Sequence, residues 1–104
     1  MITAIVQIKL SASVTIEKAT SLFADAAQNY RDTPGLIRKY FLVSEDGSTV
    51  GGAYLWESQE EAEQLYSEEW RQTITNKYGT EPSVSYFASP VIVDNLADSI
   101  IIDD

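Results

Sequence analysis

The side chains that could bind or transform a ligand in this 104-residue sequence are mainly aromatic. Tryptophan and tyrosine combine a large apolar body with a polar tip, so a group of them could form a dry pocket for an aromatic ligand. The same spacing is also typical of an ordinary packed core, and both interpretations stay open. The candidate pocket residues are Phe23, Arg38, Tyr40, Gly52, Tyr54, Trp56, Tyr66, Trp70 and Tyr86.

Arg38 is the candidate that carries a charge. Tyr54 and Trp56 share one face of a predicted strand, and Arg38 shares one face of the neighbouring predicted strand with Tyr40. If these two faces coincide, Arg38 lies beside Tyr54 or Trp56 as a hydrogen-bond donor for an anionic ligand. The alternative for Arg38 is a salt bridge with a glutamate at the rim of the sheet.

The pair Gly51-Gly52 lies at the start of a stretch that otherwise has the composition of a strand. Glycine weakens a strand and often marks a close approach of another group to the backbone. We expect Gly52 to leave space for a ligand or a bulky helix residue, and Gly51 to let a partner subunit approach. A β-bulge is the alternative explanation.

Two absences restrict the chemistry of any site. The chain has no cysteine and no histidine, which excludes disulfides, thiolate metal sites and Ser-His-Asp catalysis. Proton transfer would fall to tyrosine, aspartate, glutamate or water, and no particular catalytic residue stands out. We expect no metal and no cofactor. The net charge of −9 makes nucleic-acid binding an unfavourable hypothesis.

The apolar N-terminus lacks the features of a targeting or membrane segment. Residues 1–10 have no basic region and no small-residue cleavage site, and they are too short to span a bilayer. We therefore expect a cytoplasmic protein with no membrane association.

The apolar pattern predicts a single domain over residues 1–104. Alternation predicts strands, whereas steps of three and four predict helices. The predicted strands are residues 3–10, 36–43, 49–56 and 83–93, the last with a bend or edge at Pro90. The predicted helices are residues 15–31 and a segment from a capping box at Ser58 to Gly79, with a break around Trp70. The acidic and apolar tail, residues 94–104, could add a short strand.

This order, β-α-β-β-α-β, is that of an α+β, ferredoxin-like fold with two helices on one face of an antiparallel sheet. The predicted strand 36–43 is apolar on both faces, although two helices can cover only one side of the sheet. The same face of a second copy is the simplest cover, which predicts a homodimer. The alternative cover is the C-terminal tail.

Several motifs resemble those of the YdhR-like monooxygenases, which belong to the antibiotic-biosynthesis-monooxygenase group of dimeric α/β-barrel proteins. The motifs are PGLIRK at 34–39, GGAYLW at 51–56, EAE at 61–63, WR at 70–71, YG at 78–79, YF at 86–87 and PVIVDN at 90–95. The resemblance implies a dimeric α/β barrel with a pocket between the helices and the sheet of each subunit. It also implies oxidation of a small aromatic or polycyclic substrate by molecular oxygen, without metal or flavin. Relatives that bind haem do so through a histidine, which this chain lacks.

Two other functions remain open for the same scaffold. One is a non-catalytic dimeric barrel that binds a small aromatic ligand. The other is an isomerase or decarboxylase of an enolisable substrate.

Overall fold

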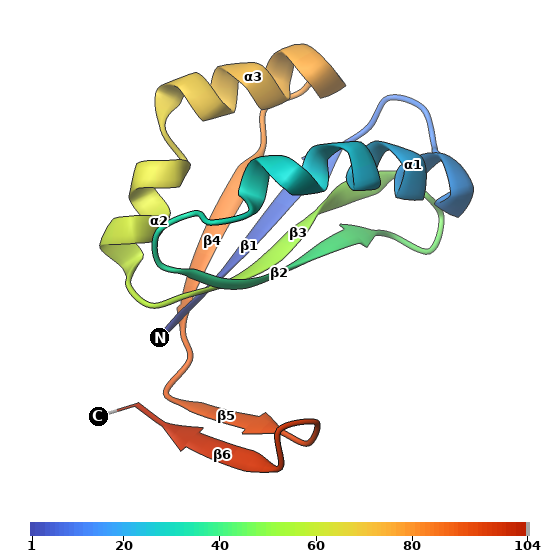
Figure 1. The fold of residues 1–104 in the computed structure, drawn as a ribbon. Coiled ribbons are helices and arrows are strands. Elements are labelled where there is room, and N and C mark those ends of the chain that lie inside the picture. Colours follow the sequence, from blue (N-terminus) through green and yellow to red (C-terminus); the bar gives the residue numbers. More distant parts are fainter. Residues whose placement is uncertain (104) are drawn as a thin grey trace.

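The computed structural model describes residues 1–103, which form six strands, three α-helices and one short 3-10 helix (Figure 1). The strands are β1 (Ile2–Lys9), β2 (Leu36–Val43), β3 (Thr49–Trp56), β4 (Ser83–Ala88), β5 (Val91–Asp94) and β6 (Ser99–Ile102). The helices are α1 (Ile16–Ala27), η1 (Gln28–Tyr30), α2 (Gln59–Leu65) and α3 (Glu68–Tyr78). Within residues 1–103, no helix is both long enough and apolar enough to cross a membrane.

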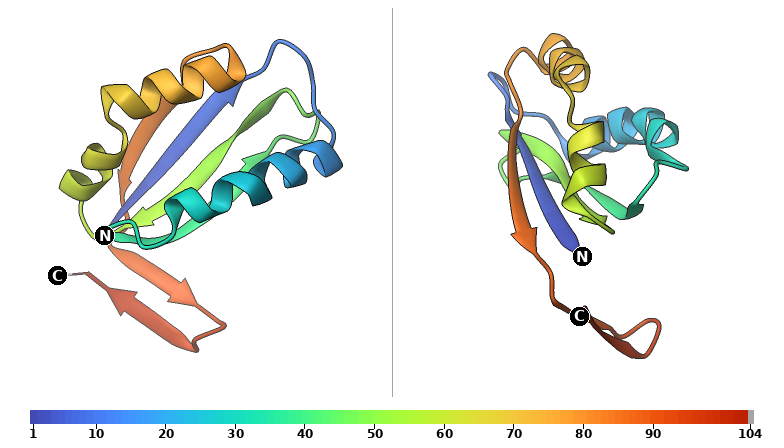
Figure 2. Two further views of the ribbon diagram at one scale, coloured as in Figure 1. Left: turned by 45° about the horizontal axis from the view of Figure 1, so that its top comes forward. Right: turned by 90° about the vertical axis from the view of Figure 1, so that its left-hand side faces the viewer.

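Four strands form one antiparallel sheet in the order β2-β3-β1-β4. The helices lie on one face of this sheet, and the right view in Figure 2 shows that no helix covers the other face. This arrangement confirms the predicted α+β, ferredoxin-like fold with an antiparallel sheet. The face that the helices cover is called the helix side below, and the bare face is called the outer face.

Side-chain caps set where the helices begin, and one cap divides the second predicted helix. The Thr15 hydroxyl accepts a hydrogen bond from the Lys18 backbone N–H at 3.1 Å, which starts α1. Ser67 does the same for the Trp70 N–H at 3.2 Å. The break therefore lies at Tyr66 and Ser67, before Trp70, and separates α2 from α3.

The predicted last strand is also divided. β4 ends at Ala88, and Ser89 and Pro90 separate it from β5. Proline has no N–H for a sheet ladder, so it favours this interruption. β5 then pairs with β6 as a separate two-stranded hairpin that projects away from the main sheet, seen at the bottom of Figure 1. This hairpin, Val91–Ile102, is called the arm below.

The core lies between the main sheet and the helices. Trp56, Ala4 and Ala62 have no exposed surface, and the Trp56 indole N–H donates a buried hydrogen bond to the Tyr66 hydroxyl at 3.1 Å. The other members of the buried cluster are Val6, Ile8, Val50, Tyr54 and Tyr66. The strand residues in this cluster come from alternate positions of β1 and β3, as expected for strands with one buried face.

The register of the β2–β3 hairpin decides which side chains face the helices. Lys39 lies opposite Tyr54 and Phe41 lies opposite Gly52, whereas Tyr40 lies opposite Ala53. Directly opposite residues share a face, so Lys39 and Phe41 are on the helix side. A bulge between Leu36 and Arg38 shifts the register by one residue at the start of β2.

That bulge changes the predicted faces of β2. Uninterrupted alternation would place Leu36 on the same face as Arg38 and Tyr40, but Leu36 packs against the core cluster on the helix side. Ile37 is 45 % exposed instead, because the extra residue of the bulge reverses the alternation at that point.

Candidate functional site

The structure separates the nine predicted pocket residues between the two faces of the sheet. Those on the helix side, or on the helices that cover it, are Phe23, Gly52, Tyr54, Trp56, Tyr66, Trp70 and Tyr86. Arg38 and Tyr40 lie on the outer face. The faces of β2 and β3 that the sequence interpretation brought together are therefore opposite faces, and Arg38 is not beside the Tyr54 or Trp56 side chain.

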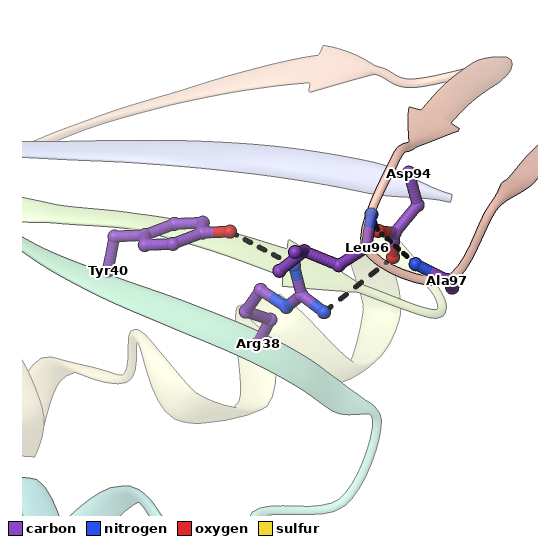
Figure 3. A network of polar contacts seen from close by, with 5 residues as sticks. All are labelled: Arg38, Tyr40, Asp94, Leu96 and Ala97. Carbon is purple, nitrogen blue, oxygen red and sulfur yellow. Dashed lines mark hydrogen bonds and ion pairs between the residues drawn. The ribbon is translucent and has the colours of Figure 1, made fainter.

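Arg38 instead takes part in a polar network between the outer face and the arm (Figure 3). Its Nη1 donates to the Tyr40 hydroxyl at 3.1 Å, and its Nη2 lies 3.9 Å from the Asp94 carboxylate. The same carboxylate accepts the N–H groups of Leu96 and Ala97, each at 3.1 Å. The hydrogen bond with Tyr40 and the nearby Asp94 raise the pKa of Arg38. The network links the arm to β2.

The helix-side aromatic rings form one continuous cluster. The Tyr66 ring centroid lies 5.3 Å from that of Tyr54, 5.8 Å from that of Trp56 and 4.9 Å from that of Trp70. Tyr86 extends the cluster, with its ring 6.2 Å from Tyr66. The pairs are edge-on or tilted, which is a favourable geometry for aromatic rings. This half of the helix–sheet space is filled by side chains.

A cavity lies beside the filled half, between α1, α3 and the sheet. Its volume is about 40 Å³, far below the roughly 300–1,000 Å³ of ordinary ligand pockets. Three of the predicted residues, Phe23, Tyr54 and Trp70, line it. Tyr30 also lines it, and further lining residues that the sequence interpretation missed are Lys39, Phe41, Lys77 and Tyr78.

Two surface hollows adjoin this cavity. One, of about 220 Å³, shares Phe23, Lys77 and Tyr78 with it. The other, of about 310 Å³, shares Tyr30 and Trp70, and again Lys77. The cavity and the two hollows therefore lie side by side between α1 and α3, the two helices that lie over the sheet in the left view of Figure 2. This set is called the α1–α3 groove below.

Lys39 is the polar group at the floor of the groove. Its Nζ lies 3.3 Å from the Tyr30 ring centroid, 3.8 Å from that of Phe41 and 4.6 Å from that of Tyr54. Burial, and secondarily repulsion by Lys77, lowers the pKa of Lys39 to about 7. A fraction of Lys39 is thus an uncharged amine at neutral pH.

The tyrosines nearby shift in the opposite direction. Burial raises the pKa of Tyr54 far above its ordinary value, and the hydroxyl of Tyr30 adds to the effect. Burial also raises the pKa of Tyr78. Tyr54 and Tyr78 therefore remain protonated at neutral pH and are poor proton acceptors.

The two adjacent glycines have different neighbours. A Cβ atom on Gly52 would lie 3.0 Å from Tyr54 Cε1 and 3.1 Å from Lys39 Cε, so glycine lets both side chains pack over the β3 backbone. A Cβ atom on Gly51 would collide with the backbone carbonyl of Val6 in β1. Gly51 therefore permits a close approach within this chain, and the expected approach of a partner subunit is not needed to explain it.

A larger hollow lies elsewhere, between the outer face and the arm. It has a volume of about 640 Å³, and its lining is mostly apolar and includes Ile37, Tyr40, Leu55 and Val93. Its polar lining includes Arg38, Tyr40 and Asp94, which belong to the network described above. Among the described residues, no group of three or more carboxylates could hold a metal ion.

Comparison with known proteins identifies the family. The sequence profile described as "Putative mono-oxygenase ydhR" matches residues 5–88, most of the chain. The chain belongs to the ydhR mono-oxygenase family. The match spans β1 to β4 and so includes every residue that lines the α1–α3 groove, whereas the arm lies beyond it. No curated protein sequence matches the chain.

Solved structures share the fold of this ydhR-family chain. A monooxygenase from the gene ActVA-Orf6 of Streptomyces coelicolor, in complex with Nanaomycin D, is similar with a TM-score of 0.65 and 21% identity, covering 85% of this chain and 86% of that one. SnoaB of Streptomyces nogalater, a cofactor-independent oxygenase, is similar with a TM-score of 0.60 and 15% identity, covering 85% of this chain and 91% of that one. At these identities the likeness shows the fold, and the reaction needs an argument from the site.

Proposed function

We propose that this ydhR-family chain is a cofactor-independent monooxygenase that oxidises a small hydroxyaromatic or polycyclic substrate in the α1–α3 groove. The observation that carries the proposal is the groove itself: aromatic rings surround one amine whose proton affinity lies near neutrality. A fold shared with a cofactor-independent oxygenase and with a monooxygenase in complex with Nanaomycin D supports the same chemistry.

In such a reaction the substrate is its own reductant. An enol or phenol loses a proton, the anion gives electrons to O2, and a methylene group becomes a carbonyl while the second oxygen atom leaves as water. The protein has to provide a site that excludes water and a charge that stabilises the anion. The rings of Phe23, Tyr30 and Phe41 provide the apolar walls, and Lys39 provides the charge.

The size of the groove limits how the substrate lies. A cavity of about 40 Å³ cannot enclose a tricyclic molecule. The substrate therefore lies along the groove with its reacting edge over Lys39 and the remainder in the hollows at either end. Substrates of one or two rings fit this geometry better than large polycyclic ones.

Oxygen uptake tests this function. Metal-free protein is mixed with one- and two-ring enolisable aromatic ketones that carry a methylene group, and with tricyclic anthrone for comparison, in an oxygen electrode. We expect uptake of one O2 for each methylene oxidised to a carbonyl. Ala26 lines the cavity, so Ala26→Phe closes the groove and abolishes uptake. Ala24 is exposed on the same helix, so Ala24→Phe is the matched control with unchanged uptake. No turnover by the wild type, together with no thermal stabilisation by any substrate, contradicts the proposal.

The same amine favours a second candidate, an isomerase or decarboxylase of an enolisable substrate. A desolvated lysine beside another cation is suited to holding an enolate, whether or not oxygen then attacks it. This activity would proceed equally well under nitrogen, whereas the oxygenase would stop. Saturable binding with no chemistry under either gas would indicate a ligand-binding protein.

We also propose that the working unit is a homodimer in which the outer faces meet. The chain exposes 6982 Å², whereas a compact monomer of 11.5 kDa exposes about 5,800 Å². Its radius of gyration is 14.4 Å, against about 13 Å for a compact chain of this length. The excess surface is on the outer face and the arm, where the exposed apolar residues are Ile37, Tyr40, Leu42, Phe87, Val91, Val93, Leu96, Ile100, Ile101 and Ile102.

An isolated two-stranded hairpin is only marginally stable in water, so the arm needs a surface to pack on. A second copy supplies that surface, and the excess of about 1,200 Å² exceeds the roughly 800 Å² that each partner buries in a standard interface. Sedimentation at micromolar concentration should give twice the chain mass. Phe87→Asp, which places a charge in the outer face, should shift the protein toward monomer. A wild-type monomer at this concentration contradicts the dimer.

A further inference from the structure

Lys39 has no anionic partner in the structure. Its Nζ is surrounded by the rings of Tyr30, Phe41 and Tyr54, and it forms no ion pair within residues 1–103. The residues that line the cavity include no aspartate or glutamate. A protonated lysine in such an environment lacks the carboxylate that normally accompanies a buried cation, so an anionic group of a ligand would complement its charge.

The titratable groups that face Lys39 come from three other elements. They are Tyr30 on η1, Tyr54 on β3, and Lys77 and Tyr78 on α3. Burial holds the protons on Tyr54 and Tyr78, as described above. Lys77 disfavours the charged form of Lys39 by repulsion. No neighbour on these elements supplies a negative charge that would keep Lys39 permanently protonated.

We propose that Lys39 is the catalytic base of the groove: its uncharged amine takes the acidic proton of a hydroxyaromatic substrate, and the ammonium ion so formed holds the resulting oxyanion. The proposal rests on the proposed function for the identity of the substrate class. It adds the identity of the residue that accepts the first proton. The sequence interpretation had assigned this role only to tyrosine, acidic residues or water.

With O2 as the oxidant, every proton and electron of the reaction is accounted for. Lys39 takes a proton from the substrate, and the substrate anion forms a C–O bond with O2 to give a peroxide anion. The Lys39 ammonium returns its proton to that peroxide. The amine then removes the remaining C–H proton while the O–O bond breaks, and the departing hydroxide takes the proton from Lys39 to leave as water. The substrate carbon loses four electrons, O2 gains four, and Lys39 ends as it began.

A chromogenic phenol tests the proton transfer without oxygen. 4-Nitrophenol absorbs at longer wavelength as the phenolate, so its spectrum reports its ionisation in the groove. At a pH where the free dye is mainly the neutral phenol, we expect wild-type protein under nitrogen to shift the bound dye to the phenolate. Lys39→Met should leave the bound dye neutral. Lys18→Met, at an exposed lysine of α1, is the control and should behave as wild type.

Turnover measurements distinguish a Lys39 that accepts a proton from a Lys39 that acts only as a positive charge. Arginine stays protonated, so Lys39→Arg should still hold the dye as phenolate but should lower kcat/KM about 100-fold, the typical contribution of a general base. It should also remove the rise of kcat/KM near neutral pH. Lys39→Gln serves as a second neutral variant if Lys39→Met is poorly folded.

Two results overturn the proposal: wild-type protein that fails to bind or ionise the dye, or neutral variants that ionise it as well as wild type. Dye ionisation that depends on Lys39 without any oxygen uptake would instead overturn the oxygenase function and keep Lys39 as a proton acceptor. The two failures are therefore distinguishable.

Discussion

Replacing Lys39 by methionine should change how the stability of the protein depends on pH. Burial lowers the pKa of Lys39 from 10.5 to about 7 in the folded chain. Between these two values the unfolded chain binds more protons than the folded one, so the free energy of unfolding rises with pH. The cost of burying the ammonium ion is fully present below about pH 7 and is relieved as the pH rises toward the unfolded pKa.

The magnitude follows from the two pKa values. From about pH 6 to about pH 9, a single group with these values raises the free energy of unfolding by at most about 2.6 kcal/mol. Lys39 is only partly buried, and solvent access reduces the expected gain to about 2 kcal/mol. Lys39→Met removes this gain, because methionine has no proton to bind and its chain fills a similar apolar volume.

Urea unfolding at several pH values measures the effect. The difference in unfolding free energy between Lys39→Met and wild type should be most favourable to the variant near pH 6 and should shrink by about 2 kcal/mol near pH 9. Lys18→Met should keep the wild-type dependence, since Lys18 is exposed. If wild type and Lys39→Met show the same dependence within about 0.5 kcal/mol, Lys39 is not desolvated in the folded chain and the argument for its role as a base fails.

Three further substitutions test the packing around the site. Gly51→Ala should unfold the chain or destabilise it by more than about 2 kcal/mol in urea titration, because the added Cβ meets the β1 backbone, which cannot move aside. Gly52→Ala should cost less, since the added Cβ would lie 3.0 Å from the Tyr54 ring and 3.1 Å from both the Lys39 side chain and the Tyr40 carbonyl, close contacts that need only small shifts. It should nevertheless weaken ionisation of the bound dye; an unchanged dye spectrum would contradict this. Trp56→Phe should lower stability by about 1–3 kcal/mol, because the buried Tyr66 hydroxyl loses its donor; a thermal midpoint equal to wild type would show that the hydrogen bond contributes nothing.

The strands of the main sheet and their order along the chain could be predicted from the sequence because both rest on strong local signals. Apolar alternation marks β1 and β3, and the turn Glu45-Asp46-Gly47-Ser48 joins β2 to β3. The break at Ser67 was harder to place, since an apolar stripe continues through it and only the capping hydroxyl marks the new helix start. The bulge after Leu36 left no signal in the alternation itself.

The sequence interpretation placed Arg38 on the wrong face of the sheet. The cause is that β2 is apolar on both faces, so alternation alone could not show which face meets the helices. Counting from the turn could have done so. With a four-residue loop, Ser44 pairs with Thr49, as the 2.8 Å hydrogen bond between their backbones shows. Each step along β2 then matches one step back along β3, which places Lys39 opposite Tyr54. The register thus identifies the lysine, and not the arginine, as the cation among the aromatic rings.

What the register could not show is the proton affinity of that lysine. An exposed lysine in the same sequence position would stay charged at neutral pH and could only attract an anion. The shift to about 7 arises because Phe41, Tyr30 and Tyr54 limit the access of water to Nζ and Lys77 approaches from α3. These neighbours come from four separate elements, so the base exists only when η1, α3 and the sheet are assembled. A chain in which α3 is displaced should therefore lose the reaction while keeping its sheet, which ties the chemistry to the groove and not to the lysine alone.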